Sequence, residues 1–65
     1  MFKLSRYFEE QALRVLRELP ADQSLAEIPV ARGFFACRGE TAPDGYALIT
    51  HVQDGNVKGL ICQRM

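Results

Sequence analysis

Two adjacent phenylalanines, Phe34 and Phe35, lie in the middle of the short apolar run ARGFFACRG. In a β-strand, successive side chains point to opposite faces of the sheet, so each phenylalanine needs its own cover. The chain has only 65 residues, and a domain of that size buries only about 60% of the surface that its unfolded form exposes. The fold is therefore constrained by what can cover both faces of one small sheet.

An amphipathic helix is predicted at about residues 3–19, within FKLSRYFEEQALRVLRELP, where apolar residues recur at spacings of three and four. Pro20 ends it, because proline disfavours helix at the residue before it. The apolar stripe consists of Leu4, Phe8, Ala12, Val15, Leu16 and Leu19. The next segment, 20–29, favours a short helical turn or a loop, since Ser24 and Glu27 have capping-box spacing but Pro29 leaves room for barely one turn.

Two apolar runs, YALITHVQ and NVKGLICQ, flank the dipeptide Asp54-Gly55. Such a dipeptide is a strong signal for a two-residue hairpin turn, and it predicts strands at about 46–53 and 56–63, after a first strand at about 30–38. The predicted fold class is α+β. A single domain, residues 1–65, has an N-terminal amphipathic helix packed on a three-stranded antiparallel sheet in an α-β-β-β meander.

The predicted turn also fixes the register of the hairpin. The expected cross-strand pairs are Val52 with Val57, Leu48 with Ile61, Ile49 with Leu60 and His51 with Lys58. Both faces of the hairpin are then apolar away from the turn, whereas a half-exposed antiparallel sheet alternates between apolar and polar residues.

One helix covers only one face of such a sheet, so the second face needs another cover. Three covers are possible: a second copy of the chain, the segment 20–29 folded back, or a different protein. We expect a homodimer, because very small domains commonly need a partner and two-fold homodimers are the commonest assembly. The predicted interface patch consists of Phe34, Phe35, Ile49 and Leu60.

Composition limits the classes of partner. Eight basic and eight acidic residues cancel, so the chain has no general attraction to nucleic acid or to an anionic membrane. No apolar stretch approaches the roughly 20 residues needed to span a bilayer, and the N-terminus lacks the apolar core of a signal peptide. The predicted location is the cytoplasm, with cysteine thiols reduced.

The two cysteines, Cys37 and Cys62, are interpreted as small core hydrophobes. In a meander the first and third strands flank the second and lie nearly 10 Å apart. A disulfide needs α-carbons within about 7 Å. A bond between Cys37 and Cys62 would therefore mean that the third strand is central and that the meander is wrong.

Two partial resemblances to known families are visible in the sequence, and neither is complete enough to assign the chain to a family. The sequence RGF at 32–34 resembles the basic–glycine–aromatic start of a strand in RNA-recognition motifs, whose aromatic residues stack on bases. Phe35 stands where that family has a small residue, and Ala36 and Gly39 replace its later aromatics. A helix followed by three strands is also similar, in outline, to small toxins that resemble double-stranded-RNA-binding domains. That likeness implies a histidine on a central strand, but the expected Gly-Ser-His surroundings and closing helix are absent here.

The leading hypothesis is a small non-enzymatic protein-interaction module: a regulator, adaptor or inhibitor of the size that phages and mobile elements often carry. It includes no catalytic residue, cofactor or metal site. The second hypothesis is a nucleic-acid-binding module with an exposed phenylalanine and the basic residues Arg32, Arg38, Lys58 and Arg64. The third is a minimal toxin or enzyme relying on His51, the only histidine.

Overall fold

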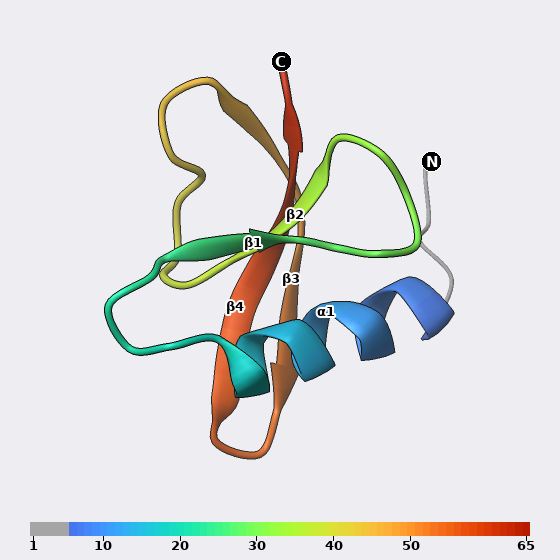
Figure 1. Cartoon of the computed structure of the whole chain (residues 1–65), viewed down its shortest axis with the longest axis vertical. Helices are drawn as coiled ribbons and strands as arrows, with labels where there is room; N and C mark the ends of the chain where they lie inside the picture. Colours follow the sequence, from blue (N-terminus) through green and yellow to red (C-terminus); the bar gives the residue numbers. More distant parts are fainter. Residues whose placement is uncertain (1–5) are drawn as a thin grey trace.

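The computed structural model describes residues 6–65 and contains one helix and one antiparallel sheet. The elements are α1 (Arg6–Glu18), β1 (Leu25–Glu27), β2 (Phe34–Cys37), β3 (Tyr46–Asp54) and β4 (Val57–Arg64). The strand order is β1-β2-β4-β3, and α1 lies across one face of the sheet (Figure 1). The predicted α+β class is confirmed, but the sheet has four strands and not three. The start of the predicted helix, including Leu4, lies outside the described residues.

The central strand is β4, so the predicted meander is wrong. β4 pairs with β2 on one side and with β3 on the other. Its middle, from Gly59 to Cys62, is buried throughout, whereas β3 carries exposed polar residues such as His51 and Gln53. A strand buried on both faces is stabilised at the centre of a sheet, and the more polar strand is tolerated at the edge.

The additional strand comes from the segment for which the sequence favoured a helical turn or a loop. β1 pairs with β2, with Leu25 opposite Cys37 and Glu27 opposite Phe35. Three extended residues satisfy their backbone groups on a neighbouring strand, which one isolated helical turn cannot do. β2 is shorter than predicted, because Gly33, with a φ of 77°, interrupts the extended backbone immediately before it.

The β3–β4 turn is displaced by one residue from the predicted position. Asp54 pairs with Val57, so Gly55 and Asn56 occupy the turn. Gly55 has a φ of 61° and Asn56 has no positive φ, as expected of a type II′ turn with glycine first. The pairing is shifted by two residues, and Val52 lies opposite Gly59. Between the turn and Thr50, a shift of two keeps each side chain on its predicted face.

A β-bulge between Leu48 and Thr50 interrupts β3. Thr50 pairs with Ile61, but Leu48 pairs with Cys62, so Ile49 is left without an opposite residue. The extra residue reverses the alternation of side chains beyond it. Leu48 consequently lies on the face away from α1, and the predicted pairs of Leu48 with Ile61 and of Ile49 with Leu60 are not formed.

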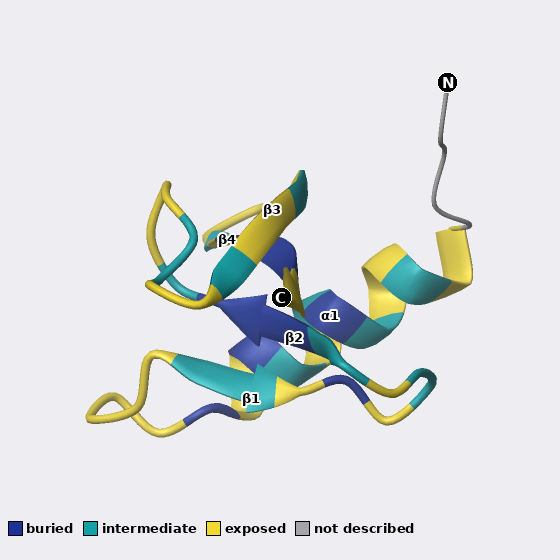
Figure 2. Ribbon diagram, turned by 90° about the horizontal axis from the view of Figure 1, so that it is seen from above, coloured by how far each residue is buried: buried dark blue, intermediate teal, exposed yellow. Residues whose placement is uncertain are grey.

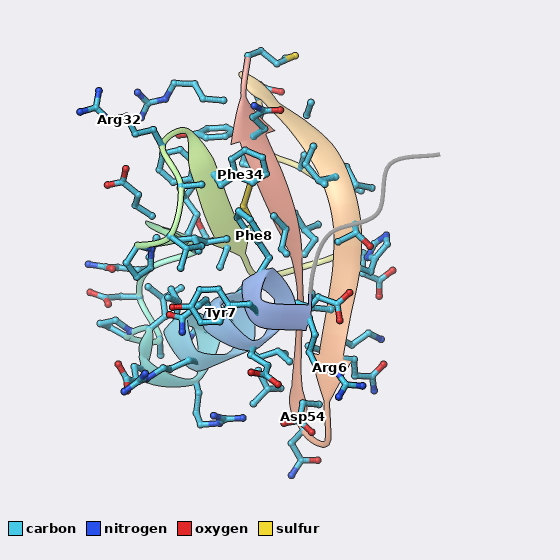
Figure 3. The ribbon with its side chains drawn as sticks, turned by 90° about the vertical axis from the view of Figure 1, so that its right-hand side faces the viewer. Arg6, Tyr7, Phe8, Arg32, Phe34 and Asp54 are labelled. Carbon is cyan, nitrogen blue, oxygen red and sulfur yellow. A yellow bond between two sulfur atoms is a disulfide. The ribbon has the colours of Figure 1, made fainter. Side chains whose placement is uncertain are left out.

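The face of the sheet beneath α1 carries the larger core. Phe8 of α1 lies against Phe34 of β2, with ring centroids 5.4 Å apart (Figure 3). The described part of the predicted apolar stripe of α1 points into this core. The buried residues of the cluster are Ala12, Leu16, Leu19, Ile28, Ala36, Val52 and Ile61.

The opposite face is covered by the chain itself. Its buried cluster consists of Phe35, Cys37, Leu60 and Cys62. Leu25, Ala42 and Tyr46 pack against this cluster. Ala42 belongs to the connection 38–45 between β2 and β3, which the sequence marked only as turn-rich, and Leu25 belongs to the segment 20–29. The two phenylalanines of the FF pair are thus covered from opposite sides by α1 and by these residues.

Cys37 and Cys62 form a disulfide between β2 and β4, with α-carbons 6.9 Å apart. This pairing follows from the central position of β4, which makes the two strands direct neighbours. The expectation of two separate core thiols is therefore wrong for this fold.

We expect the disulfide to stabilise the oxidised chain by about 3 kcal/mol, because the bond closes a loop of intermediate length in the unfolded state. Urea unfolding with and without reductant measures the difference. A Cys37→Ala/Cys62→Ala variant is the control, and its unfolding midpoint should not respond to reductant. Alkylation of both cysteines in unreduced, denatured protein, read by intact mass, would contradict the assignment.

Gly59 permits the close approach of α1 to the sheet. A β-carbon at this position would lie 2.5 Å from the carbonyl oxygen of Cys37 and 2.7 Å from Leu16 Cδ1. We expect Gly59→Ala to lower the free energy of unfolding by about 3 kcal/mol, at the upper end of the usual cost of overpacking, because the nearest obstructing atom belongs to the backbone. Gly55→Ala meets no atom within 4 Å and should cost only the backbone strain of about 1 kcal/mol. Urea unfolding of both variants tests this, and equal losses would contradict it.

Candidate functional site

The free edge of the sheet is formed by β3, a strand of nine residues. One side of β3 pairs with β4, and within residues 6–65 no strand pairs with its other side. Figure 2 shows that β3 is mostly exposed or intermediate, in contrast to the buried β2. An edge of this length presents a row of backbone N–H and C=O groups on which another strand can pair.

The opposite edge of the sheet is much shorter. β1 has three residues and is followed closely by Pro29. Short strands and nearby prolines are common features that prevent pairing at a sheet edge. β3 contains no proline, lysine or arginine. Its one formal charge, Asp54 at the hairpin end, lies 3.3 Å from Arg17 of α1 in an ion pair.

An exposed apolar segment lies on β3 before the bulge. Leu48 is 44% exposed, Ala47 is exposed, and Tyr46 and Ile49 are half-buried. The other exposed large hydrophobic residues between positions 6 and 65 are Tyr7 on α1 and the terminal Met65. Leu48 is therefore the exposed large hydrophobic side chain that lies on an unpaired strand edge.

The four residues of the predicted interface patch do not form one surface. Leu60 is fully buried, and Phe35 is 8% exposed. Both belong to the cluster on the face away from α1. Phe34 and Ile49 are half-buried and pack with the α1 side. The bulge separates Ile49 from Leu60 by placing them on opposite faces, and an interface role stays a prediction for the half-buried Phe34 and Ile49.

Leu48 was not among the predicted interface residues, because the unbroken register placed it opposite Ile61 and under the helix. One signal was available in the sequence. The run Tyr46–Ile49 is apolar at every position. Alternate residues of such a strand can fill one buried face, and the others then place apolar side chains on the opposite face. The bulge that selects Leu48 for exposure has no such signal.

Arg38, predicted to contact nucleic acid, is a structural residue. Its guanidinium donates hydrogen bonds to the carbonyl oxygens of Pro20 and Gln23, each at 2.7 Å, and to that of Leu19. Its backbone N–H donates to the carbonyl of Ser24 at 2.8 Å. These bonds satisfy carbonyls in the segment 19–23 that follows α1, and they hold the connection between α1 and β1 in place.

The remaining predicted basic residues do not converge on one surface. Arg64 lies over the ring of Phe35, with its guanidinium carbon 5.1 Å from the ring centroid, a cation–π geometry. Lys58 is six residues away on the same strand, a distance of roughly 20 Å along the strand. Arg32 is exposed near the end of the molecule far from Asp54 (Figure 3). Phe35 is covered by Arg64 and Tyr46 and offers no free ring for a base.

His51 lies in an open pocket of about 370 Å³ on the β3–β4 hairpin. The pocket is lined by Gly39, Glu40, His51, Val52, Gln53, Lys58 and Gly59. His51 pairs with Leu60, whereas the sequence predicted that it pairs with Lys58. The lining offers hydrogen-bonding and charged groups but no serine, threonine or cysteine as a nucleophile. In the described part of the chain, no group of three or more His, Cys, Asp or Glu side chains could hold a metal ion.

Comparison with protein-family models, with curated proteins and with solved structures gives no match to this chain. None of the helices in residues 6–65 combines the length and the apolar character required to cross a membrane.

We expect Arg38→Ala to lower the free energy of unfolding by about 1–3 kcal/mol, because it leaves the carbonyls that follow α1 without their charged donor. Arg32→Ala is the matched control, since Arg32 is exposed and surface substitutions usually change stability by less than about 0.5 kcal/mol. Urea unfolding measures both. Equal stability of the two variants would contradict a structural role for Arg38.

Proposed function

We propose that the chain is a small, non-enzymatic protein-interaction module, a regulator, adaptor or inhibitor, that binds a partner through the free edge of β3. The observation that carries this proposal is a nine-residue edge strand with an exposed leucine and no charged residue before its last position. Natural edge strands are commonly kept from pairing by charge, proline or extreme shortness. Apart from the bulge between Leu48 and Thr50, the edge of β3 has none of the features that usually prevent pairing, and a partner that covers the edge would explain this.

Strand addition is a known mode of recognition with a clear physical basis. The main-chain groups of an edge supply hydrogen bonds, and alternate side chains supply specificity. Here Leu48 and Tyr46 lie on the face away from α1, and Ala47 lies on the other. The backbone N–H of Tyr46 already donates to the carbonyl oxygen of Pro43 at 3.1 Å. A strand added to β3 would remove Leu48 from water and pair the remaining outer backbone groups at the same time.

The two other hypotheses have weaker support. Binding of nucleic acid would require Arg38 to leave its carbonyl partners and Arg64 to uncover Phe35. The remaining exposed cations are dispersed in a chain of net charge zero. A hydrolytic role for His51 lacks a nucleophile among the residues that line its pocket.

The test is site-specific photo-crosslinking in living cells. A benzophenone amino acid replaces Leu48 in one variant and Tyr7 in a second, which is the matched control because Tyr7 is also exposed but lies on α1 and points away from β3 (Figure 3). We expect a discrete covalent adduct with protein from position 48 and none from position 7. Mass spectrometry of the adduct identifies the partner.

The proposal fails if position 48 yields no adduct, or the same adducts as position 7. Circular dichroism of both purified variants verifies that each is folded, so that a missing adduct reports on the surface and not on the stability of the chain.

A further inference from the structure

We infer that the connection 38–45 acts as a lid over the Cys37–Cys62 disulfide, so that a thiol reductant reaches the two sulfur atoms only when this lid opens. The folded chain then keeps its disulfide in the presence of a thiol reductant for as long as the lid stays closed. The inference concerns access to the disulfide and does not depend on the function proposed for the edge of β3.

The disulfide is out of reach of solvent in the folded chain. Cys37 is 1% exposed, and Cys62 is fully buried. Thiol–disulfide exchange begins when a thiolate attacks one of the two sulfur atoms, so its rate depends on access to them. Some part of the cover must therefore move before reduction begins.

Most of the cover is held in place by the sheet. The strand residues that pack around the disulfide are Leu25, Phe35, Tyr46 and Leu60. Among the described residues of this cluster, only Ala42 lies outside the strands. It belongs to the connection that runs from the end of β2 to the start of β3 (Figure 1). This connection is the part of the cover that can move while the sheet stays paired.

The connection is weakly held along its middle. Residues 39–41 are exposed, and Ala42 is half-buried. Within residues 6–65, no hydrogen bond joins the stretch 39–42 to the rest of the chain. Segments with few buried apolar contacts open locally at a lower free-energy cost than the core. The free energy of opening is therefore expected to be smaller for this stretch than for the whole chain.

Both ends of the connection are fastened, which confines the movement to its middle. At its start, the guanidinium of Arg38 donates hydrogen bonds to carbonyl oxygens of the segment 19–23. At its end, the carbonyl oxygen of Gly45 accepts a hydrogen bond from the N–H of Met65 at 2.9 Å. A segment that is fixed at both ends and free between them opens and closes without unfolding of the sheet.

Reduction by a dithiol proceeds in two exchanges once the lid is open. One thiolate of the reductant attacks one sulfur atom of the protein disulfide, forms a mixed disulfide with that cysteine and releases the other cysteine as a thiolate. The second thiolate of the reductant then attacks the mixed disulfide, closes the internal disulfide of the reductant and releases the first cysteine. The protein gains two electrons, and two protons once both thiolates are protonated, and the reductant supplies the two electrons.

The rate of reduction by dithiothreitol tests the inference, with the oxidised full chain as the substrate and intact mass after alkylation as the readout. Ala42→Glu places a carboxylate against the apolar cluster and favours the open lid, because an unpaired buried charge is costly. We expect reduction at least about tenfold faster than in the parent, which corresponds to 1.4 kcal/mol in the opening equilibrium. Thr41→Glu is the matched control. It adds the same charge at the exposed neighbouring position, and its rate should stay close to that of the parent.

The urea dependence of the parent's rate distinguishes opening of the lid from unfolding of the whole chain. Opening of the lid exposes little surface, so the logarithm of the rate should change little with urea below the unfolding transition. Reduction through global unfolding would instead show the full slope of the equilibrium unfolding curve. This measurement needs no variant, so it decides between the two routes even if Ala42→Glu fails to fold.

A rate that shows the full equilibrium slope overturns the inference, as does an Ala42→Glu variant that is folded by circular dichroism and reduced no faster than Thr41→Glu. A parent chain that is reduced as fast as the urea-denatured chain also overturns it, because the cover would then give the disulfide no protection. The same holds for a parent chain isolated with both thiols free.

Discussion

The close contact between α1 and β4 determines the rest of this structure. Gly59 has no side chain, and Leu16 of α1 occupies the space that a β-carbon would need. Fully buried residues follow on β4, with Ile61 facing the helix and Leu60 facing the other side. A strand that buries both faces must have a neighbour along each edge and a cover over each face. The strand order and the path of the connections follow from that requirement.

The face of the sheet away from α1 is covered by the segment 20–29 and by the connection 38–45. The connection 38–45 begins at Arg38, whose side chain is fixed to the carbonyls that follow α1. Ala42 then packs on the cluster around Leu60 and the disulfide. One arginine thus joins the end of the helix, the entry to β1 and the start of the covering loop. A domain this small has few buried residues, and it uses a single well-bonded polar side chain to organise three segments.

Much of this arrangement was predictable from sequence, and the rest depended on contacts that sequence does not display. The stripe of α1 and the Asp54-Gly55 signal are local patterns, so the helix and the hairpin were found. Strand order depends on which strand is buried on both faces of the sheet, and the apolar content of β3 and β4 is too similar to predict which of them that is. Arg38 resembles any surface arginine until its carbonyl partners are known. The bulge at Ile49 has no recognisable pattern in the sequence. It places Leu48 on the face away from α1 instead of the predicted face beneath the helix.

That bulge connects the core to the edge. Without it, Leu48 would continue the alternation of Thr50 and Val52 and lie under α1, where it would be buried. With it, Leu48 lies beside Cys62, at the margin of a face whose centre is already covered, and remains 44% exposed. Bulges are common devices for discouraging pairing at sheet edges, yet this one exposes a leucine on the segment that remains regular. An edge that is interrupted after Leu48 and apolar before it restricts pairing to one short register, and a restricted register is what a specific interaction requires.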